Sequence, residues 1–441
     1  VTEAIPIPAT SMVPLLLLPT LGIAPVGQVA PTYASPFIIL LMGGFFIALT
    51  LEKWNLHRRI ALGVIARVGS SPGRLVLGFM IAGAALSMWI SNTATALMML
   101  PIAVAVLQRT EERVGKGPGV RAFGVALMLG IAYACNIGGL GTPIGTPPNL
   151  IMISQYEKMF PNAEEITFVS WALTALPIVV IMLGAIWFIL TRVTNRIPKD
   201  LDIGDASTIA AEAKALGSLT VPERRVLIIF GLTALFWITR KPIAIAGLSI
   251  GGWSPLLGLN GRVDDGTVAI GAALLMFLIP AGGSQKRDVR LLDWETAVKI
   301  PWGLLLLFGG GLALASGFKS TGLSVWVGER MASVTDLPPV LMIGIICLGV
   351  TFLTEVTSNT ATTTILMPIL ASVCKTTGVD PMSLMLPAAM SASCAFMLPV
   401  ATAPNAIVFG SGRIEMGDMV KNGFVINLIG VVVITAVLVL F

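Results

Sequence analysis

The chain has 441 residues, of which 55% are hydrophobic and only 12% are charged, and its mean hydropathy is +0.90. Soluble globular proteins carry about 25% charged residues, so the composition excludes a soluble globule and predicts a polytopic membrane protein. The net charge of +5 comes from basic residues spread over loops rather than gathered in one patch, which argues against binding to nucleic acid.

The first residues of the chain, which does not begin with methionine, are interpreted by comparison with its second half. Residues 1–6 are followed by an apolar span at about Ser11 to Ala24. In the second half, a full span from Val226 to Ile238 comes first, and another runs from Val268 to Ile279. Residues 1–6 therefore look like the tail of a helix whose body is missing. We expect at least one further transmembrane helix ahead of them.

The next pair of matching segments joins an apolar span to an amphipathic helix. Pro36 to Leu51 is followed by a basic amphipathic stretch, Asn55 to Val68, and Pro301 to Ser316 is followed by Leu323 to Met331. The amphipathic stretches are expected to lie along the membrane surface. Pairs of adjacent glycines in the two spans predict close helix packing: Gly43-Gly44 and Gly309-Gly310.

A polar stretch ending in Ser-Asn-Thr-Ala-Thr then occurs twice, at residues 87–95 and 354–362. Each copy lies near the middle of a long apolar segment. One membrane crossing needs about 20 residues, and each of these segments is longer. A continuous helix would place Asn92 or Asn359 in hydrocarbon at a cost of about a few kcal/mol. We therefore predict two re-entrant helical hairpins whose polar tips face a cavity.

Both halves then contain an apolar span that runs into a stretch rich in glycine, proline and threonine. These are Ala122 to Ile137 followed by 138–149, and Leu384 to Val400 followed by 401–405. Such residues unwind a helix at mid-membrane and expose carbonyls that bind cations, while the restarted helices offer N-termini that bind anions. Asn149 and Asn405 are expected to cap the restarted helices. A final span closes each half: Phe168 to Leu190 and Phe424 to Leu440.

These elements predict an all-α polytopic membrane protein built from two inverted repeats, each with a re-entrant helical hairpin and a broken transmembrane helix. An odd number of crossings in the first half inverts the second. The predicted parts are a first repeat at 1–194, a cytoplasmic linker at 195–221 and a second repeat at 222–441. Lysine and arginine crowd alternate loops, which the positive-inside rule assigns to the cytoplasm.

With its paired Ser-Asn-Thr stretches and paired Thr-x-Pro-Asn breaks, the sequence resembles the divalent-anion:sodium symporter family of di- and tricarboxylate transporters. The resemblance implies a secondary transporter, not an enzyme, that couples inward sodium movement to uptake of a dicarboxylate such as succinate. It further implies a homodimer in the cell inner (plasma) membrane. In each subunit a transport domain would move as an elevator against a scaffold domain.

The resemblance also implies two sodium sites and one substrate site. The first sodium would bind Ser87, Ser91, Asn92 and the carbonyl of Gly145, and the second Thr354, Ser358, Asn359 and the carbonyl of Ala401. Substrate carboxylates would meet Asn92, Thr93, Thr146, Asn359, Thr360 and Thr402. The sequence departs from the family pattern at Ala403, where a proline commonly follows the threonine.

Other functions remain as alternatives. A sodium-independent exchanger of dicarboxylates or other divalent anions could use the same scaffold, although no lysine or arginine lies in either hairpin tip to replace the cation. No charged filter ring, catalytic constellation or nucleotide-binding motif is visible, which argues against a channel, an intramembrane enzyme and a primary pump. Glu355, whose repeat partner is Met88, is either a cation or proton ligand or an acid that braces the hairpin.

Overall fold

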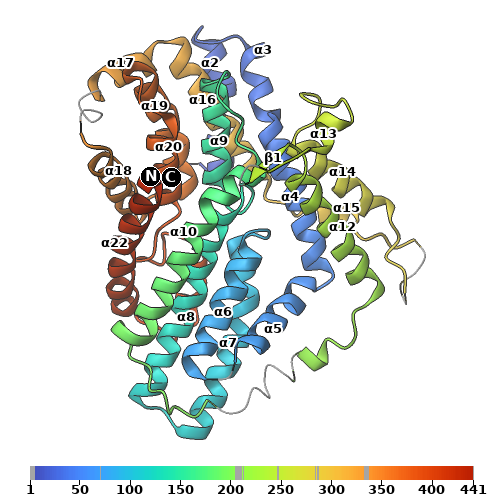
Figure 1. Cartoon of the computed structure of the whole chain (residues 1–441), viewed down its shortest axis with the longest axis vertical. Coiled ribbons are helices and arrows are strands. Elements are labelled where there is room, and N and C mark those ends of the chain that lie inside the picture. Colours follow the sequence, from blue (N-terminus) through green and yellow to red (C-terminus); the bar gives the residue numbers. More distant parts are fainter. Residues whose placement is uncertain are drawn as a thin grey trace. The chain divides into compact units, whose positions relative to one another are not determined.

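The computed structural model of the chain describes residues 5–69, 71–203, 211, 213–245, 248–283, 285, 288–331 and 337–440. These residues are mainly helical and include one pair of short antiparallel strands (Figure 1). Six helical stretches among them are long and apolar enough to cross a membrane: Val26–Lys53, Asn92–Val114, Pro118–Gly141, Phe168–Thr194, Trp302–Ser320 and Met416–Leu440. The chain forms two compact units, and each unit takes segments from both halves of the sequence.

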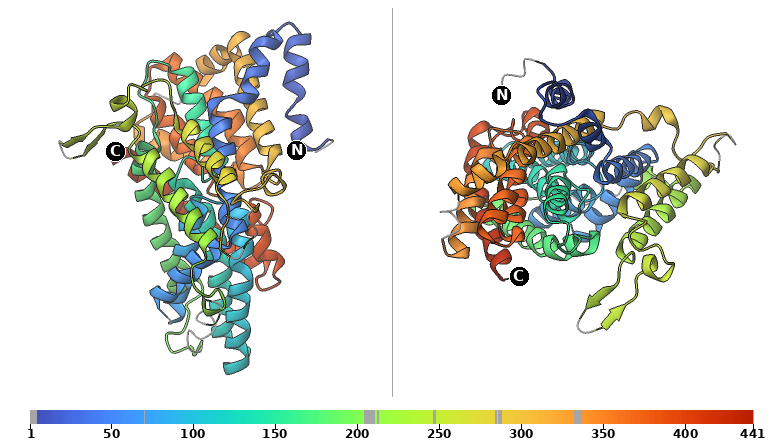
Figure 2. Two further views of the ribbon diagram at one scale, coloured as in Figure 1. Left: turned by 90° about the vertical axis from the view of Figure 1, so that its right-hand side faces the viewer. Right: turned by 90° about the horizontal axis from the view of Figure 1, so that it is seen from above.

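Unit 1 consists of Val1–Leu56, Ile153–Leu173 and Ser218–Val327. It contains α1 (Ile7–Thr10), α2 (Val13–Thr20), α3 (Val26–Val29), η1 (Ala30–Ala34), α4 (Pro36–Lys53), α12 (Val221–Ile238), β1 (Ile243–Ile245), β2 (Leu248–Ile250), α13 (Trp253–Leu256), α14 (Asp265–Leu278), α15 (Trp294–Ala297), α16 (Trp302–Ser320) and the start of α17 (Leu323–Met331). Parts of α9 (Pro147–Met159) and α10 (Phe168–Phe188) also belong to it. The strands project beyond the neighbouring helices of this unit (Figure 2).

Small residues set the helix packing of unit 1. Helix α4 packs against α14, and a Cβ added to Gly43 would lie only 2.6 Å from the Cβ of Ala269. Helix α16 packs against α1 and α2, and a Cβ on Gly310 would collide with the backbone carbonyl of Ser11. The prediction that the glycine pairs permit close packing is therefore confirmed at these two positions.

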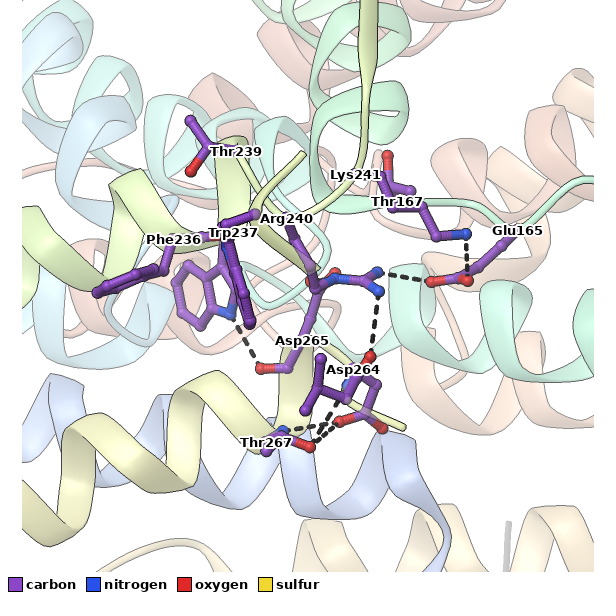
Figure 3. A network of polar contacts seen from close by, with 12 residues as sticks. Glu165, Thr167, Phe236, Trp237, Thr239, Arg240, Lys241, Asp264, Asp265 and Thr267 are labelled. Carbon is purple, nitrogen blue, oxygen red and sulfur yellow. Dashed lines mark hydrogen bonds and ion pairs between the residues drawn. The ribbon is translucent and has the colours of Figure 1, made fainter. Parts of the chain in front are cut away.

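A network of charged side chains centred on the buried Arg240 joins three segments of unit 1 (Figure 3). Arg240, which is 4% exposed, donates from Nε to Asp265 Oδ1 at 2.5 Å and from Nη2 to Glu165 Oε1 at 2.6 Å. Lys241 pairs with the other carboxylate oxygen of Glu165, and Trp237 Nε1 donates to the Asp265 carbonyl at 2.9 Å. Since Glu165 lies between α9 and α10 whereas Asp265 begins α14, the network ties that connection to α12 and α14.

Unit 2 consists of His57–Met152, Thr174–Gly217 and Gly328–Phe441. It contains α5 (Leu56–Val68), α6 (Pro72–Ser87), α7 (Asn92–Val114), α8 (Pro118–Gly138), η2 (Gly139–Gly141), η3 (Ile189–Thr194), α18 (Pro339–Thr354), α19 (Asn359–Thr377), α20 (Pro381–Ala392), α21 (Ala403–Gly410) and α22 (Met416–Leu440), with the remaining parts of α9 and α10. Helix α8 is predominantly apolar and is buried from Phe123 to Gly138, as expected for a helix in a core. Helices α6 and α7 of the first half pack against it (Figure 1). Helix α21 of the second half also packs against it.

Two predicted spans have different boundaries in the structure. The span predicted at Ser11 to Ala24 is shorter in the structure, where α2 covers Val13–Thr20 and Gly22 turns the chain after it with a positive φ of 68°. Helix α22 begins at Met416 rather than at the predicted Phe424. Its first turns accommodate polar residues because the Asn422 side chain bonds to the Asp418 carbonyl within the helix. The predicted linker 195–221 lies partly outside the described residues.

Candidate functional site

The first Ser-Asn-Thr stretch forms a turn between two helices. Helix α6 ends at Ser87 and α7 begins at Asn92, so the predicted break is present at this position. The Ser87 hydroxyl lies 2.8 Å from the backbone carbonyl of Cys135 on α8 and within hydrogen-bonding distance of Asn92 Oδ1. Ser91 caps α7, because its side chain accepts a hydrogen bond from the Ala94 amide at 3.1 Å.

The second stretch forms the same turn from different residues. Helix α18 ends at Thr354 and α19 begins at Asn359, with Ser358 as its cap. The Thr354 hydroxyl lies 2.6 Å from Asn359 Oδ1 and 2.8 Å from the backbone carbonyl of Ala392. A hydroxyl carries one proton, so it can donate to only one of these two oxygens. Each turn therefore gathers three neutral oxygens around a single proton, an arrangement that favours a hard cation.

The neighbouring threonines differ in exposure. Thr93 is exposed at the start of α7, whereas Thr360 at the start of α19 is 8% exposed. Each directly follows the asparagine that begins its helix. The first turn of each helix leaves amide groups without helical partners, and these carry the positive end of the helix dipole. An anion is therefore favoured beside each turn.

Asn149 and Asn405 hold the two broken helices. Each side-chain amide donates to backbone carbonyls ten and seven residues earlier in the chain. The distances are 2.9 Å to Gly139, 2.8 Å to Thr142, 3.1 Å to Ala395 and 3.0 Å to Leu398. These amides replace hydrogen bonds that the chain loses where it unwinds.

The prediction that Asn149 and Asn405 cap the restarted helices is wrong. Thr402 is the N-cap of α21: its backbone is extended, and its hydroxyl accepts from the Asn405 amide at 3.3 Å. Asn405 lies within the first turn of α21, and Asn149 within the first turn of α9. A cap must have non-helical backbone geometry, which an asparagine inside the helix does not have.

The carbonyl implied for the first sodium site lies beside the first turn. A Cβ built on Gly139 would come within 3.0 Å of Asn92 Oδ1 and 3.2 Å of the Gly145 carbonyl oxygen. Both oxygens therefore lie against the same glycine, while Thr146 next to them is buried. Ala401 is buried in the turn before α21, where its amide donates to the Leu398 carbonyl at 3.2 Å.

The Glu355 side chain is 3% exposed and is held by four donors. It accepts from the backbone amides of Phe396 at 2.6 Å, Met397 at 2.9 Å and Leu398 at 3.1 Å, and from Asn427 Nδ2 at 2.8 Å. These donors satisfy a buried carboxylate by hydrogen bonds rather than by a cation. Of the two interpretations of Glu355, the structure therefore supports the acid that braces the second turn against the unwound stretch.

Two residues of α8 connect the first half to the unwound stretch of the second half. The Tyr133 hydroxyl donates to the Phe396 carbonyl at 2.7 Å, and the two rings meet edge to face at 5.0 Å. Asn136 Nδ2 lies 3.1 Å from Thr402 Oγ1 and 3.4 Å from Asn405 Oδ1. Sequence reasoning missed both residues. The available signal was a single amide, Asn136, in the part of α8 that follows Arg121 and is otherwise without amide or charged side chains.

The polar groups of the two turns and of the unwound stretches are uncharged, apart from the braced Glu355. Within the described residues, no group of three histidine, cysteine, aspartate or glutamate side chains is placed to hold a metal ion. A cation at these turns would therefore be held by hydroxyl, amide and carbonyl oxygens. Such ligands suit hard cations rather than transition metals.

Comparison with known sequences identifies the relatives of this chain. The profile of the sodium:sulfate symporter transmembrane region matches residues 1–441. The sodium-dependent dicarboxylate transporter SdcS of Staphylococcus saprophyticus is 43% identical over 440 residues, which are 99% of this chain and 82% of that protein. SdcS of Staphylococcus aureus strain NCTC 8325 has the same identity and coverage.

Solved structures share the fold at much lower identity. The Alcanivorax borkumensis YdaH transporter superposes with a TM-score of 0.60 at 15% identity, covering 94% of this chain and 86% of its own. Neisseria gonorrhoeae MtrF gives a TM-score of 0.58 at 12% identity, covering 97% and 85%. From the profile match and the 43% identity to SdcS, we conclude that the chain belongs to the divalent-anion:sodium symporter family and is a multi-pass protein of the plasma membrane.

Proposed function

We propose that this chain couples inward movement of sodium ions to uptake of a dicarboxylate such as succinate. The observation that carries the proposal is the matched pair of turns, in which Ser87 and Thr354 each share one proton with an asparagine oxygen and a backbone carbonyl. Relatives at 43% identity are named sodium-dependent dicarboxylate transporters, which supports both the ion and the substrate class.

Each turn is proposed to bind one sodium ion. Oxygen ligands without formal charge can bind and release a monovalent cation during each transport cycle, as a carrier requires. The position of Asn92 Oδ1 and the Gly145 carbonyl against Gly139 supports the first site. The proposed ligands are Ser87, Ser91, Asn92 and Gly145 for one ion, and Thr354, Ser358, Asn359 and Ala401 for the other.

The substrate is proposed to lie between the helix N-termini that adjoin the two turns. With Oδ1 of Asn92 or Asn359 facing a sodium ion, the amide nitrogen of the same side chain can donate to a carboxylate. Two such positions suit an anion with a carboxylate at each end. The proposed substrate residues are Asn92, Thr93, Thr146, Asn359, Thr360 and Thr402.

The repeated contacts also support an internal duplication. We propose two inverted repeats, 1–194 and 222–441, joined by a cytoplasmic linker at 195–221, with the two Ser-Asn-Thr turns at the tips of re-entrant hairpins. Both turns and both unwound stretches belong to unit 2, so this unit could carry the whole site as one body. We propose that unit 2 moves as an elevator against unit 1 in a homodimer.

Uptake into proteoliposomes tests the transport function. Labelled succinate, citrate and sulfate are offered under an inward gradient of sodium, potassium or choline, and separately with an unlabelled anion inside. Sodium-driven accumulation of succinate is expected. Equal uptake with potassium or choline would contradict sodium coupling, and uptake that needs only an internal anion would identify an exchanger.

A crosslink tests the elevator separately. A bifunctional reagent that joins a cysteine at position 74, near the start of α6 in unit 2, to a cysteine in unit 1 should stop transport. Sodium-dependent binding of succinate to the trapped state should remain. Transport that survives complete crosslinking would refute the proposed movement of unit 2.

A further inference from the structure

The Thr402 hydroxyl has both of its acceptor positions occupied. Its oxygen accepts from Asn136 Nδ2 at 3.1 Å and from the backbone amide of Asn405 at 3.3 Å. A hydroxyl has one proton to donate and two lone pairs to accept with. In the part of the chain that the structure describes, the Thr402 hydroxyl donates to no protein group. Its proton is therefore left for an acceptor from outside.

Backbone carbonyls fix the direction of these hydrogen bonds. The Asn405 side chain lies against the carbonyls of Ala395 and Leu398, which can only accept, so its nitrogen faces them and its oxygen is turned toward Asn136. Asn136 in turn meets that oxygen and the Ala395 carbonyl, each at 3.4 Å. Only its amide nitrogen can face these acceptors, because its oxygen cannot donate. The nitrogen has two protons for three acceptors, so the two contacts at 3.4 Å share one proton and the other is left for Thr402 Oγ1, the nearest of the three at 3.1 Å.

The two asparagines of this hydrogen-bond network are buried, whereas Thr402 is partly accessible. Asn136 is 1% exposed and Asn405 is 0% exposed, so neither amide can exchange its partners for water. Thr402 is only half-buried and lies at the N-terminus of α21, where the helix dipole favours an anion. The first half differs, because the amide of Asn149 donates to the backbone carbonyl of Thr146 and not to its hydroxyl.

We propose that Asn136 is a positioning residue that commits the Thr402 hydroxyl to donate a hydrogen bond to a substrate carboxylate. The inference rests on the proposed function, since it assumes that the anion lies beside Thr402. Asn136 belongs to the first half of the chain, whereas the Thr402 hydroxyl that it orients belongs to the second half. Thr146 and Thr402 then differ: the protein sets the hydroxyl direction only at Thr402.

A double-mutant cycle tests this role. Asn136→Leu and Thr402→Val each remove one partner with little change in size, and each is expected to raise the KM for succinate by about tenfold or more, with a smaller change in maximal rate. If Asn136 acts through the hydroxyl, the double variant has the KM of Thr402→Val alone. Independent effects that multiply in the double variant would overturn the proposal.

Two further variants guard against a simple loss of structure. Asn422→Leu removes another buried amide of unit 2, which bonds to the Asp418 carbonyl and to Asn195 but not to Thr402, and its effect on KM should multiply with that of Thr402→Val. If Asn136→Leu does not fold, Asn136→Asp keeps the shape but offers an acceptor that captures the Thr402 proton. The increase in KM from Asn136→Asp should then be smaller in the Thr402→Val background, and an equal increase in both backgrounds would refute the inference.

The result that would contradict the proposed function differs from the result that would contradict the role of Asn136. A wild-type protein without sodium-driven succinate uptake would contradict the transport proposal, whatever the cycle shows. A wild-type protein that does transport succinate, combined with a multiplicative cycle, would contradict only the role of Asn136.

Discussion

Asn149 and Asn405 make the same pair of hydrogen bonds in the two halves of the chain, each to the carbonyls ten and seven residues before it. Both side chains are 0% exposed. A chain that unwinds inside a membrane protein must satisfy its carbonyls without water. A single asparagine does this for two carbonyls at once, so the same side chain stabilises both unwound stretches.

Replacing Asn405 by leucine should destabilise the protein. The change removes the stronger donor from the Ala395 and Leu398 carbonyls, which keep only contacts to Asn136 Nδ2 at 3.4 Å and to the Ala401 amide at 3.2 Å. The expected cost is about 1 kcal/mol for each hydrogen bond lost. The thermal unfolding midpoint of the detergent-purified protein measures the effect. The control is Asn162→Leu in an exposed loop, which should leave the midpoint unchanged. Equal midpoints for the two variants would contradict the role of Asn405.

Close approach within the first unwound stretch predicts that Gly145→Ala abolishes most succinate uptake. A Cβ at this position would collide with the carbonyl oxygen of Gly139. The unwound stretch would then have to move at Gly145, whose carbonyl is a proposed sodium ligand. Gly184→Ala is the matched control, because a Cβ there meets nothing within 4 Å and alanine favours the helix. Initial uptake rates at equal protein in the membrane compare the two. Normal uptake by Gly145→Ala would show that this packing is not needed.

Much of the fold could be predicted from local composition. The breaks at residues 88–91 and 355–358 lie where polar residues interrupt long apolar segments, and the unwound stretches lie where glycine and proline concentrate. These signals are local, because hydrocarbon excludes polar side chains and proline lacks a backbone donor. Because the pattern occurs twice in the sequence, the likeness of the two turns was predictable as well.

The partners of individual side chains could not be predicted in this way. Glu355 finds its four donors on the unwound stretch and on α22, and Asn136 finds Thr402, because separate helices pack together. The Arg240 network likewise joins residues far apart in the chain. Sequence spacing carries no information on such contacts. It also misassigned the caps, since a cap depends on backbone geometry that asparagine content does not determine.

Asn359→Asp should separate the two ligands of that residue. The carboxylate keeps an oxygen for sodium beside Thr354, but it loses the amide donor and adds a charge that repels an anion. Sodium binding should be retained or tightened, while succinate binding weakens by about 1–3 kcal/mol. Asn359→Leu should weaken both. Calorimetric titration of sodium and then succinate distinguishes these outcomes. Wild-type affinity of Asn359→Asp for succinate near neutral pH would reduce the residue to a structural brace.

The Glu165 network predicts a dependence of stability on pH. Burial raises the pKa of Glu165, but the hydrogen bonds from Lys241 and Arg240 outweigh it, and the pKa is lowered below its ordinary value of 4.5. A carboxyl with a lowered pKa in the folded state stabilises that state above its ordinary pKa. This contribution is lost as the pH falls through the lowered pKa.

The unfolding midpoint of the wild type should therefore exceed that of Glu165→Gln at pH 7, and the difference should shrink as the pH falls below 4.5. Glu164→Gln is the control, because Glu164 is exposed beside it in the same loop, and its midpoint should follow the wild type throughout. A difference between wild type and Glu165→Gln that stays constant from pH 7 to well below 4.5 would rule out the ionised pair as its source.

The central claim, that the two oxygen-lined turns bind the driving ions, is tested most directly by the sodium dependence of initial succinate uptake in proteoliposomes. The account predicts a sigmoidal dependence for the wild type and no uptake in choline. For Ser87→Ala and for Thr354→Val it predicts a higher half-saturating sodium concentration and a dependence closer to hyperbolic. Wild-type uptake that proceeds equally in choline, or sodium dependence that both substitutions leave unchanged, would contradict it.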